Sequence, residues 1–417
     1  MKKFSLFVAA AAVAFGFAAC QPKGPSTFSL TVTVSDQGVE SPVGLPDSYT
    51  VTLTNTSTMA STELETENGE VVFEGLVAGV YDVNASATLV DGGSTFIFSG
   101  SSKSVSVLAD AEAAVSIAFS KSSALIFKEI YYCGAPGDSY YFRDQFYEIY
   151  NQSDATVYAD GLCIAETFYA NWDFSLFYEW DIANPSDYVF AQTIWQIKGS
   201  GTDYPIAPGE SIVIAQWAVD HRREDLSKGM SQVDLSGAEF EAVLEESTTW
   251  NGIVLTDNAA INMDKAVNAT GYNTPQWLTS VGGAAYVIFN PSSPLKNDEF
   301  ILASNVENTV AAREIAIADI LDAVQAGSDE TRASTLGLPT VLDAGFQYLG
   351  ASYLGKSIAR KKTGETEDGR PIFQDTNNTP NDFENFDTPQ VRRDDVGVPS
   401  WNNWIKSFLK INKPYIR

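Results

Sequence analysis

The sequence predicts a mainly β protein with two β-sandwich domains. At 417 residues, the chain exceeds one typical domain of roughly 100 to 200 residues. Short runs such as FSLTVTV (28–34) and AAVSIAF (113–119) alternate apolar and polar residues, which is typical of strands with one buried face. Aromatic residues make up 12% of the chain and charged residues 19%, which favours a folded β-rich protein over a disordered acidic chain.

Residues 1–20 predict a lipoprotein signal peptide. Lys2 and Lys3 precede a short apolar run (4–16), and small residues stand directly before Cys20. This pattern resembles a bacterial lipobox, which implies cleavage before Cys20 and acylation of its side chain. An ordinary secretory signal with a chance cysteine is the alternative. With residues 21–27 as a polar tether, we expect the lipid on Cys20 to hold the protein in the outer membrane, on either its periplasmic or its surface side.

The charge balance bears on the expected partners. The formal net charge is −27 and is spread along the chain. Nucleic acid is therefore not an expected partner, because phosphate backbones bind clustered Lys and Arg side chains. For the same reason, we expect the lipid anchor rather than a basic surface to hold the protein at the bilayer.

Residues 28–120 are predicted to form the first sandwich. Its most specific stretch is NGEVVFEGLVAGVYDV (68–83), in which Gly75 and Gly79 permit a tight turn and Phe73 and Tyr81 supply apolar contacts. The stretch resembles transthyretin-like, or carboxypeptidase-regulatory-like, domains. That resemblance implies a spacer or binding platform without catalytic chemistry.

Residues 124–410 are predicted to form the second, larger sandwich. Four blocks occur in order: IFKEIYY, YEIYNQSDATVYADGLCI, YPIAPGESIVIA and GKSIARKKTG followed by IFQDTNNTPNDF. They resemble the lamin-tail domain, which implies an immunoglobulin-like fold with large insertions here at about 167–203 and 217–349. The positions that match the family's motif are Glu148, Asn151, Gly161, Arg360 and Asp375. The resemblance implies an ion pair between Arg360 and the aspartate of the following loop.

The second insertion is expected to contain one helix. In residues 306–327, apolar side chains recur at helical spacing and Gly327 provides a stop. The insertion is also rich in aromatic and amide residues, which favours core filling over a ligand surface. Both domains together are similar to an uncharacterised family of large lipoproteins from Bacteroidales-type bacteria, domain of unknown function 4876.

Glu129 and Glu148 form the first candidate catalytic pair. Each occupies an apolar stretch flanked by tyrosines, LIFKEIYY and FYEIYN. The resemblance implies that these acids hydrogen-bond locally and help to set the strand pairing. The alternative is a glycosidase pair, which needs two carboxyl groups about 5 to 9 Å apart beside a sugar.

Other catalytic and metal sites are less favoured. The single histidine, His221, is predicted on a solvated loop, and common hydrolase, zinc and phosphate-binding motifs are absent from the sequence. Cys133 and Cys163 are either a disulfide or two buried free thiols, with free thiols preferred. Closure of the sandwich through Asx turns is preferred over a calcium site for one acidic loop, whose candidate ligands are Asp375, Asn377, Asn381, Asp382 and Asp387.

The expected function is therefore non-enzymatic. A lipid anchor, two sandwiches and the lack of a catalytic set predict a cell-envelope binding, adhesion or scaffold protein without a cofactor. Two more specific expectations are an accessory of a TonB-dependent outer-membrane receptor and a binder of an extracellular protein or glycan. The alternative is a glycan-active hydrolase that uses carboxylates of the strands or insertions.

Overall fold

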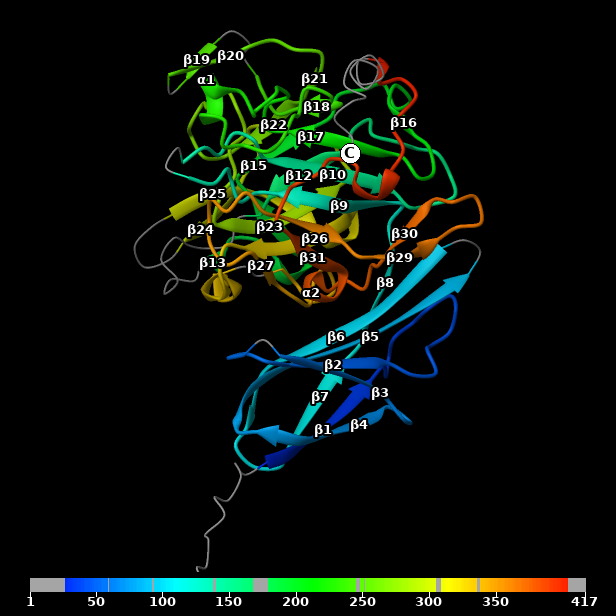
Figure 1. Cartoon of the computed structure of the whole chain (residues 1–417). Coiled ribbons are helices and arrows are strands. Elements are labelled where there is room, and N and C mark those ends of the chain that lie inside the picture. The colour runs from blue at the N-terminus through cyan, green and yellow to red at the C-terminus, as the bar shows by residue number, and fades with distance from the viewer. Residues whose placement is uncertain are drawn as a thin grey trace, which may run out of the picture.

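The computed structural model contains two β-rich domains joined by a short linker (Figure 1). It describes residues 27–403 except 59, 92–93, 138–139, 168–178, 245–247, 251, 305–308 and 336–337. The predicted signal peptide, the lipidation site at Cys20 and nearly all of the tether lie outside the described residues. Among the helices of the described part, none combines the length and the apolar character needed to cross a bilayer.

The N-terminal domain is a sandwich of two sheets around one apolar core. The smaller sheet has the order β4 (Glu70–Val77), β1 (Thr27–Ser35), β7 (Ala111–Ser116). The larger has the order β3 (Ser61–Glu65), β2 (Thr50–Asn55), β5 (Gly79–Asp91), β6 (Ser94–Val107), β8 (Ala118–Lys121). Alternation along β1 buries Leu30 and Val32, while Phe73 and Tyr81 fill the core as the sequence pattern predicts.

One glycine of the predicted turn has a different role. Gly75 lies within β4 at φ +74°, where the pairing of β1 with β4 shifts register. The positive φ favours glycine, and the extra residues on β4 form a bulge that bends the strand. The Tyr81 hydroxyl donates a hydrogen bond to the Val77 carbonyl oxygen at 2.8 Å, which holds the connection from β4 to β5.

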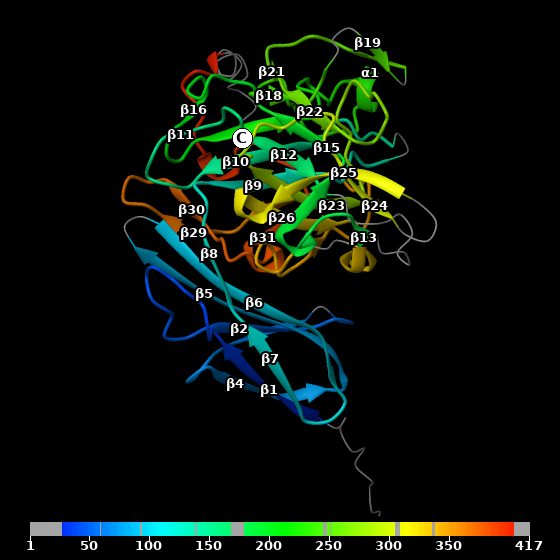
Figure 2. The same ribbon diagram turned by 180° about the vertical axis from the view of Figure 1, so that it is seen from behind.

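The C-terminal domain has a seven-stranded sheet as its first layer (Figure 2). In order these strands are β21 (Ile261–Asn262), β18 (Phe240–Glu241), β17 (Ser211–Ala215), β10 (Phe146–Asn151), β9 (Leu125–Tyr131), β28 (Ser357–Arg360) and β31 (Phe383–Phe386). Its centre, β9, β10 and β17, consists of the apolar stretches that the sequence predicts as strands. All three strands are buried along their full length.

Two further sheets form the second and third layers. The middle sheet has the order β22 (Asp264–Asn268), β15 (Thr193–Gln196), β12 (Cys163–Glu166), β23 (Gly283–Phe289), β26 (Ile320–Gly327), β27 (Gln347–Tyr348). The outer sheet has the order β13 (Glu179–Trp180), β24 (Ile301–Ser304), β25 (Thr309–Ala316), β14 (Tyr188–Ala191). One apolar core lies between the first two sheets and another between the middle and outer sheets.

Short elements complete the C-terminal domain. Three two-stranded ribbons pair β11 (Val157–Tyr158) with β16 (Pro205–Ile206), β19 (Thr248–Trp250) with β20 (Ile253–Leu255), and β29 (Lys362–Glu365) with β30 (Pro371–Phe373). The helices of the described part have one or two turns: α1 (Glu224–Ser227), α2 (Thr379–Asp382), η1 (Pro185–Asp187), η2 (Ile317–Asp319), η3 (Glu330–Thr335) and η4 (Arg393–Asp395).

The helix predicted over 306–327 is wrong. The described part of this range forms β25, the single turn η2 and β26. The chain passes from the outer sheet to the middle sheet at η2. On β26, Val324 enters one core and Ala323 the other, so both faces are apolar. A strand buried on both faces carries an apolar run that periodicity alone does not separate from a helix.

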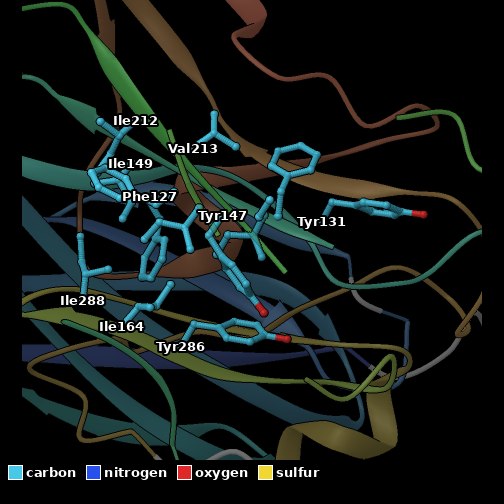
Figure 3. Packing of buried hydrophobic residues seen from close by; sticks show 14 of the residues in the cluster. Phe127, Tyr131, Tyr147, Ile149, Ile164, Ile212, Val213, Tyr286 and Ile288 are labelled. Atoms are coloured by element: carbon cyan, nitrogen blue, oxygen red, sulfur yellow. The ribbon is translucent and has the colours of Figure 1, made fainter. Parts of the chain in front are cut away.

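Both predicted insertions supply interior strands. All four strands of the outer sheet and five of the six strands in the middle sheet come from residues 167–203 or 217–349. Their aromatic side chains fill the core, as the sequence favours: Tyr286 of β23 packs against Tyr147 of β10, with ring centroids 5.2 Å apart (Figure 3). Trp277 also stacks on Tyr147, with ring centroids 5.1 Å apart.

Candidate functional site

Glu129 and Glu148 lie directly opposite each other on the antiparallel strands β9 and β10. The pairing skips Lys128, so that a bulge brings this lysine beside the two acids. All three side chains are fully buried. They are in contact with residues 388–403, which we call the C-terminal segment.

The Glu129 carboxylate accepts hydrogen bonds from three groups. They are the Ser357 hydroxyl at 2.7 Å, the Gln390 backbone N–H at 2.8 Å and the Arg393 guanidinium at 3.0 Å. Burial raises the pKa of Glu129, and Arg393 opposes that rise. The donors come from β28 and from the C-terminal segment, so this acid joins a strand edge to the segment that covers it.

The Glu148 carboxylate is bound in a similar way. It accepts hydrogen bonds from the Ser211 hydroxyl at 2.7 Å and from the Arg392 backbone N–H at 3.0 Å. The Arg392 side chain forms an ion pair with buried Glu239 at 2.5 Å. Both members of the candidate catalytic pair are thus bonded to protein donors, in agreement with local hydrogen bonding across the strands.

The C-terminal segment adopts an uncommon backbone conformation over these acids. Arg392, Asp394 and Asp395 have φ values of 57°, 68° and 58°, which are rare for residues other than glycine. Such conformations persist where surrounding contacts hold them. Here the contacts are the bonds to Glu129 and Glu148 and the burial of Val396 against Ile126 and Tyr150.

A second buried ionic group surrounds Arg360. Its guanidinium contacts Asp322 at 2.7 Å, Asp375 at 3.2 Å and Asp382 at 3.5 Å. It also donates to the carbonyl oxygens of Phe127 and Gln374, each at 2.7 Å. Burial raises the pKa of Asp322 and of Asp382, and Arg360 opposes both rises. The pair of Arg360 with Asp375 is the one that the family resemblance implies.

The loop considered for calcium directs most of its oxygen atoms to protein donors. Asp382 accepts bonds from the Thr376 N–H, the Asn378 N–H and the Thr376 hydroxyl. Asp375 accepts a bond from Ser122 at 2.6 Å, and Asn377 donates to Ser120 at 2.9 Å, so the loop contacts both the linker between the domains and strand β8. Asn381 accepts from Lys361 through its carbonyl oxygen, and exposed Asp387 pairs with Lys356.

His221 is fully buried, so its prediction on a solvated loop is wrong. One ring nitrogen contacts the Tyr141 hydroxyl at 2.7 Å and the other the Trp217 carbonyl oxygen at 2.8 Å. Burial lowers the pKa of His221 to about 4, and the bond to Trp217 opposes that shift. The charged residues around it in sequence, such as Asp220 and Arg222, point outward and pair with each other.

The remaining predicted positions pack in the core or hold turns in place. Cys133 and Cys163 are buried free thiols that belong to different core clusters. The Asn151 side chain donates to the carbonyl oxygens of Ala155 and Ile206, each at 2.8 Å, and so fixes the turn after β10. Gly161 has φ +80° beside open space, which fits a turn that requires glycine.

An exposed tyrosine pair was not found from the sequence. The rings of Tyr140 and Tyr353 meet edge to face, 5.4 Å apart, and the Tyr140 side chain is 66% exposed. Both residues have positive φ, 46° and 58°. A bond from the Tyr353 N–H to the Cys133 carbonyl oxygen, at 2.7 Å, holds the two loops together. Only the fold brings these loops together, because 212 residues separate them in the chain.

Fold and site together define a class: a two-domain, all-β protein whose candidate acids are bound in buried ionic groups. The family model described as "Protein of unknown function (DUF4876)" matches residues 207–390. A crystal structure of a DUF4876 family protein from Bacteroides thetaiotaomicron VPI-5482 is 32% identical in sequence. The match covers 91% of this chain and 99% of that one, with a TM-score of 0.59. The chain therefore belongs to the DUF4876 family. No curated protein matches it.

Proposed function

We propose that this protein is a non-enzymatic lipoprotein of the cell envelope, anchored through Cys20, that binds a protein partner in the outer membrane. The burial and hydrogen bonding of Glu129 and Glu148 are the main support for the non-enzymatic part of the proposal. Both are fully buried, and each accepts bonds from a serine hydroxyl and from the C-terminal segment. A glycosidase pair has to reach a sugar and a water molecule, which this arrangement prevents.

The Tyr140–Tyr353 pair supports the binding part of the proposal. Leu354, next to Tyr353 in the chain, and Met230, in the loop after α1, are 37% and 40% exposed. A Cβ atom on Gly137 would lie 2.8 Å from the Met230 side chain, so the loop that carries Tyr140 packs on it. Tyrosine and methionine are enriched at protein interfaces. The edge-to-face contact between the two rings limits their freedom before a partner binds, and such pre-organisation reduces the entropy lost on binding.

Co-purification from detergent-solubilised outer membranes tests the binding part. We expect the wild-type chain to retain a defined receptor, identified by mass spectrometry, and Tyr140→Ala with Tyr353→Ala to lose it. Tyr272→Ala is the matched control, because Tyr272 is 75% exposed in a different loop. Retention by the double variant, or binding only to a glycan array, would contradict a protein partner at this surface.

Separate experiments test the anchor and the lack of catalysis. A palmitate analogue should label the wild-type protein, and Cys20→Ala should remove the label. Purified protein should leave a glycan panel unchanged. Turnover that Glu148→Gln abolishes would favour the hydrolase instead.

A further inference from the structure

The Lys128 ammonium group is placed unusually for a buried charge. It is fully buried, and its Nζ atom has no hydrogen-bond partner within the described part of the chain. Glu148 Oε2 lies 3.8 Å away and Asp394 Oδ2 lies 3.7 Å away, both beyond a normal hydrogen bond. The Phe373 ring faces the same atom, with its centroid at 5.5 Å. A buried ammonium without hydrogen bonds is costly, so this arrangement needs an explanation.

Asp394 is held in place by its neighbours in sequence. Arg393 is bonded to Glu129, and the Arg392 backbone is bonded to Glu148. Asp394 itself has φ 68°. These contacts fix the C-terminal segment on both sides of the Lys128 bulge. The Lys128 amine and the Asp394 carboxyl group are therefore held close together. Fixed proximity of this kind greatly accelerates reaction between two groups.

We propose that Lys128 and Asp394 form an intramolecular isopeptide bond, with Glu148 as the proton carrier. The Lys128 Nζ attacks the Asp394 Cγ, a C–N bond forms, and one C–O bond of the carboxyl group breaks. Glu148 carries two protons in turn from the Lys128 nitrogen to the departing oxygen of Asp394. The first moves before the attack and frees the nitrogen lone pair, and the second moves after it, so that the oxygen leaves as water. An ammonium and a carboxylate thus become a neutral amide and water. No oxidant or further reactant is needed, and Glu148 returns to its initial state.

The surroundings distinguish the roles of the two acids. Glu148 is fully buried and is fixed by Ser211 and by the Arg392 N–H, which hold its carboxylate beside the Lys128 amine. Asp394 is 28% exposed at its side chain, which gives the released water a path to solvent. The amide also removes a buried ammonium group that lacks hydrogen bonds from the site beside Phe373. The inference is independent of the proposed binding function.

Peptide mapping of the denatured full chain tests the bond. Tryptic digestion of the wild type should give the peptide Ser122–Arg143 joined to Asp394–Lys406, lighter than the sum of the two by about 18 Da, the mass of one water. Unlinked peptides of full mass would overturn the proposal. An Asp394 peptide that has lost water but is not linked indicates a succinimide, and a link from Lys128 to a Glu148 peptide indicates another acceptor. Both results would also overturn it.

Variants separate the roles of the three residues. Asp394→Ala should give only unlinked peptides, whereas Asp395→Ala, a change to the exposed acid next to it, should keep the link. Asp394→Asn should form the same amide with loss of ammonia. Glu148→Gln retains both reacting groups and should slow bond formation at least tenfold after refolding. A full rate of linkage in Glu148→Gln would exclude the proton carrier, and a link in Asp394→Ala would exclude Asp394.

Discussion

Arg360 on β28 and Asp322 on β26 form an ion pair at 2.7 Å, and both side chains are buried. The two strands belong to different sheets, so the pair connects the first layer of the domain with the middle layer. Asp322 also accepts a bond from the Phe127 N–H at 2.7 Å. The family resemblance pairs Arg360 with the aspartate of one loop. Through Asp322, the same guanidinium also links two sheets.

Replacing Arg360 should strongly destabilise the C-terminal domain. Arg360→Met leaves Asp322, Asp375 and Asp382 buried without their shared cation, and we expect a loss of about 3 to 5 kcal/mol in the free energy of unfolding. Urea denaturation followed by tryptophan fluorescence measures it. Arg370→Met is the control, because Arg370 pairs with exposed side chains, and we expect a loss of at most about 1 kcal/mol there. Equal losses in both variants would contradict this account.

The acidic loop should respond to mutation more than to calcium. Asp375→Ala removes bonds to Arg360 and Ser122, so we expect the C-terminal domain to lose about 1 to 3 kcal/mol. The melting of the N-terminal domain should be unchanged. Calcium and magnesium at equal ionic strength should shift the melting temperature alike, since screening acts in both cases. A calcium-specific rise that Asp375→Ala abolishes would assign a metal site instead.

Asp343 should make the protein less stable as the pH rises. Burial raises the pKa of Asp343 to about 7, although Thr379, Gln325 and Gly345 donate bonds to the carboxyl group. Between pH 4 and 7 the unfolded chain loses this proton while the folded chain keeps it. Folding stability therefore falls across that window, by on the order of 4 kcal/mol. Urea denaturation at several pH values should show a flatter dependence for Asp343→Asn, and an unchanged slope would contradict the buried proton.

His221 should make the protein more stable as the pH rises, in contrast to Asp343. Because the pKa of His221 is lowered to about 4 in the folded state, acid protonates the unfolded chain first. Its contribution is complete above about pH 6.5 and is lost as the pH falls toward 4, by roughly 3 kcal/mol. As the chain has one histidine, the titration of its ring signals in NMR spectra of untagged protein is unambiguous. A midpoint near 6.5 in the folded protein would contradict the buried neutral ring.

The sequence predicted strands correctly in two cases: where one face of the strand is exposed to solvent, and where a short apolar run is bounded by turn residues. β1 shows the first case, and β9, β10 and β17 show the second. β26 was predicted as a helix because both of its faces are apolar and its alanines favour helices. The insertions lie outside the four blocks that resemble the lamin-tail domain, so their strands became visible only through pairing with distant strands such as β12.

The candidate site was predictable only in part. Arg360 and Asp375 were found because their motif occurs in one stretch of sequence. Lys128, Arg392 and Arg393 were missed, since a single lysine in a strand and an exposed-looking VRRDD run carry no sign of burial. The burial and pairing of these three residues depend on contacts with residues more than 200 positions away, which local sequence patterns do not encode. His221 was misplaced for the same reason, because its charged neighbours in sequence are not its neighbours in space.

The C-terminal segment also bears on the order in which the chain matures. The N-terminal sandwich uses only strands within residues 27–121, so it can fold as soon as those residues have emerged. In the next domain, Lys128, Glu129 and Glu148 find their partners among residues 390–394, which are synthesised more than 200 residues later. A ribosome that still holds residues 390–394 therefore delays the closing step. Chains stalled before residue 390 would present unpaired buried charges and be early targets for proteases.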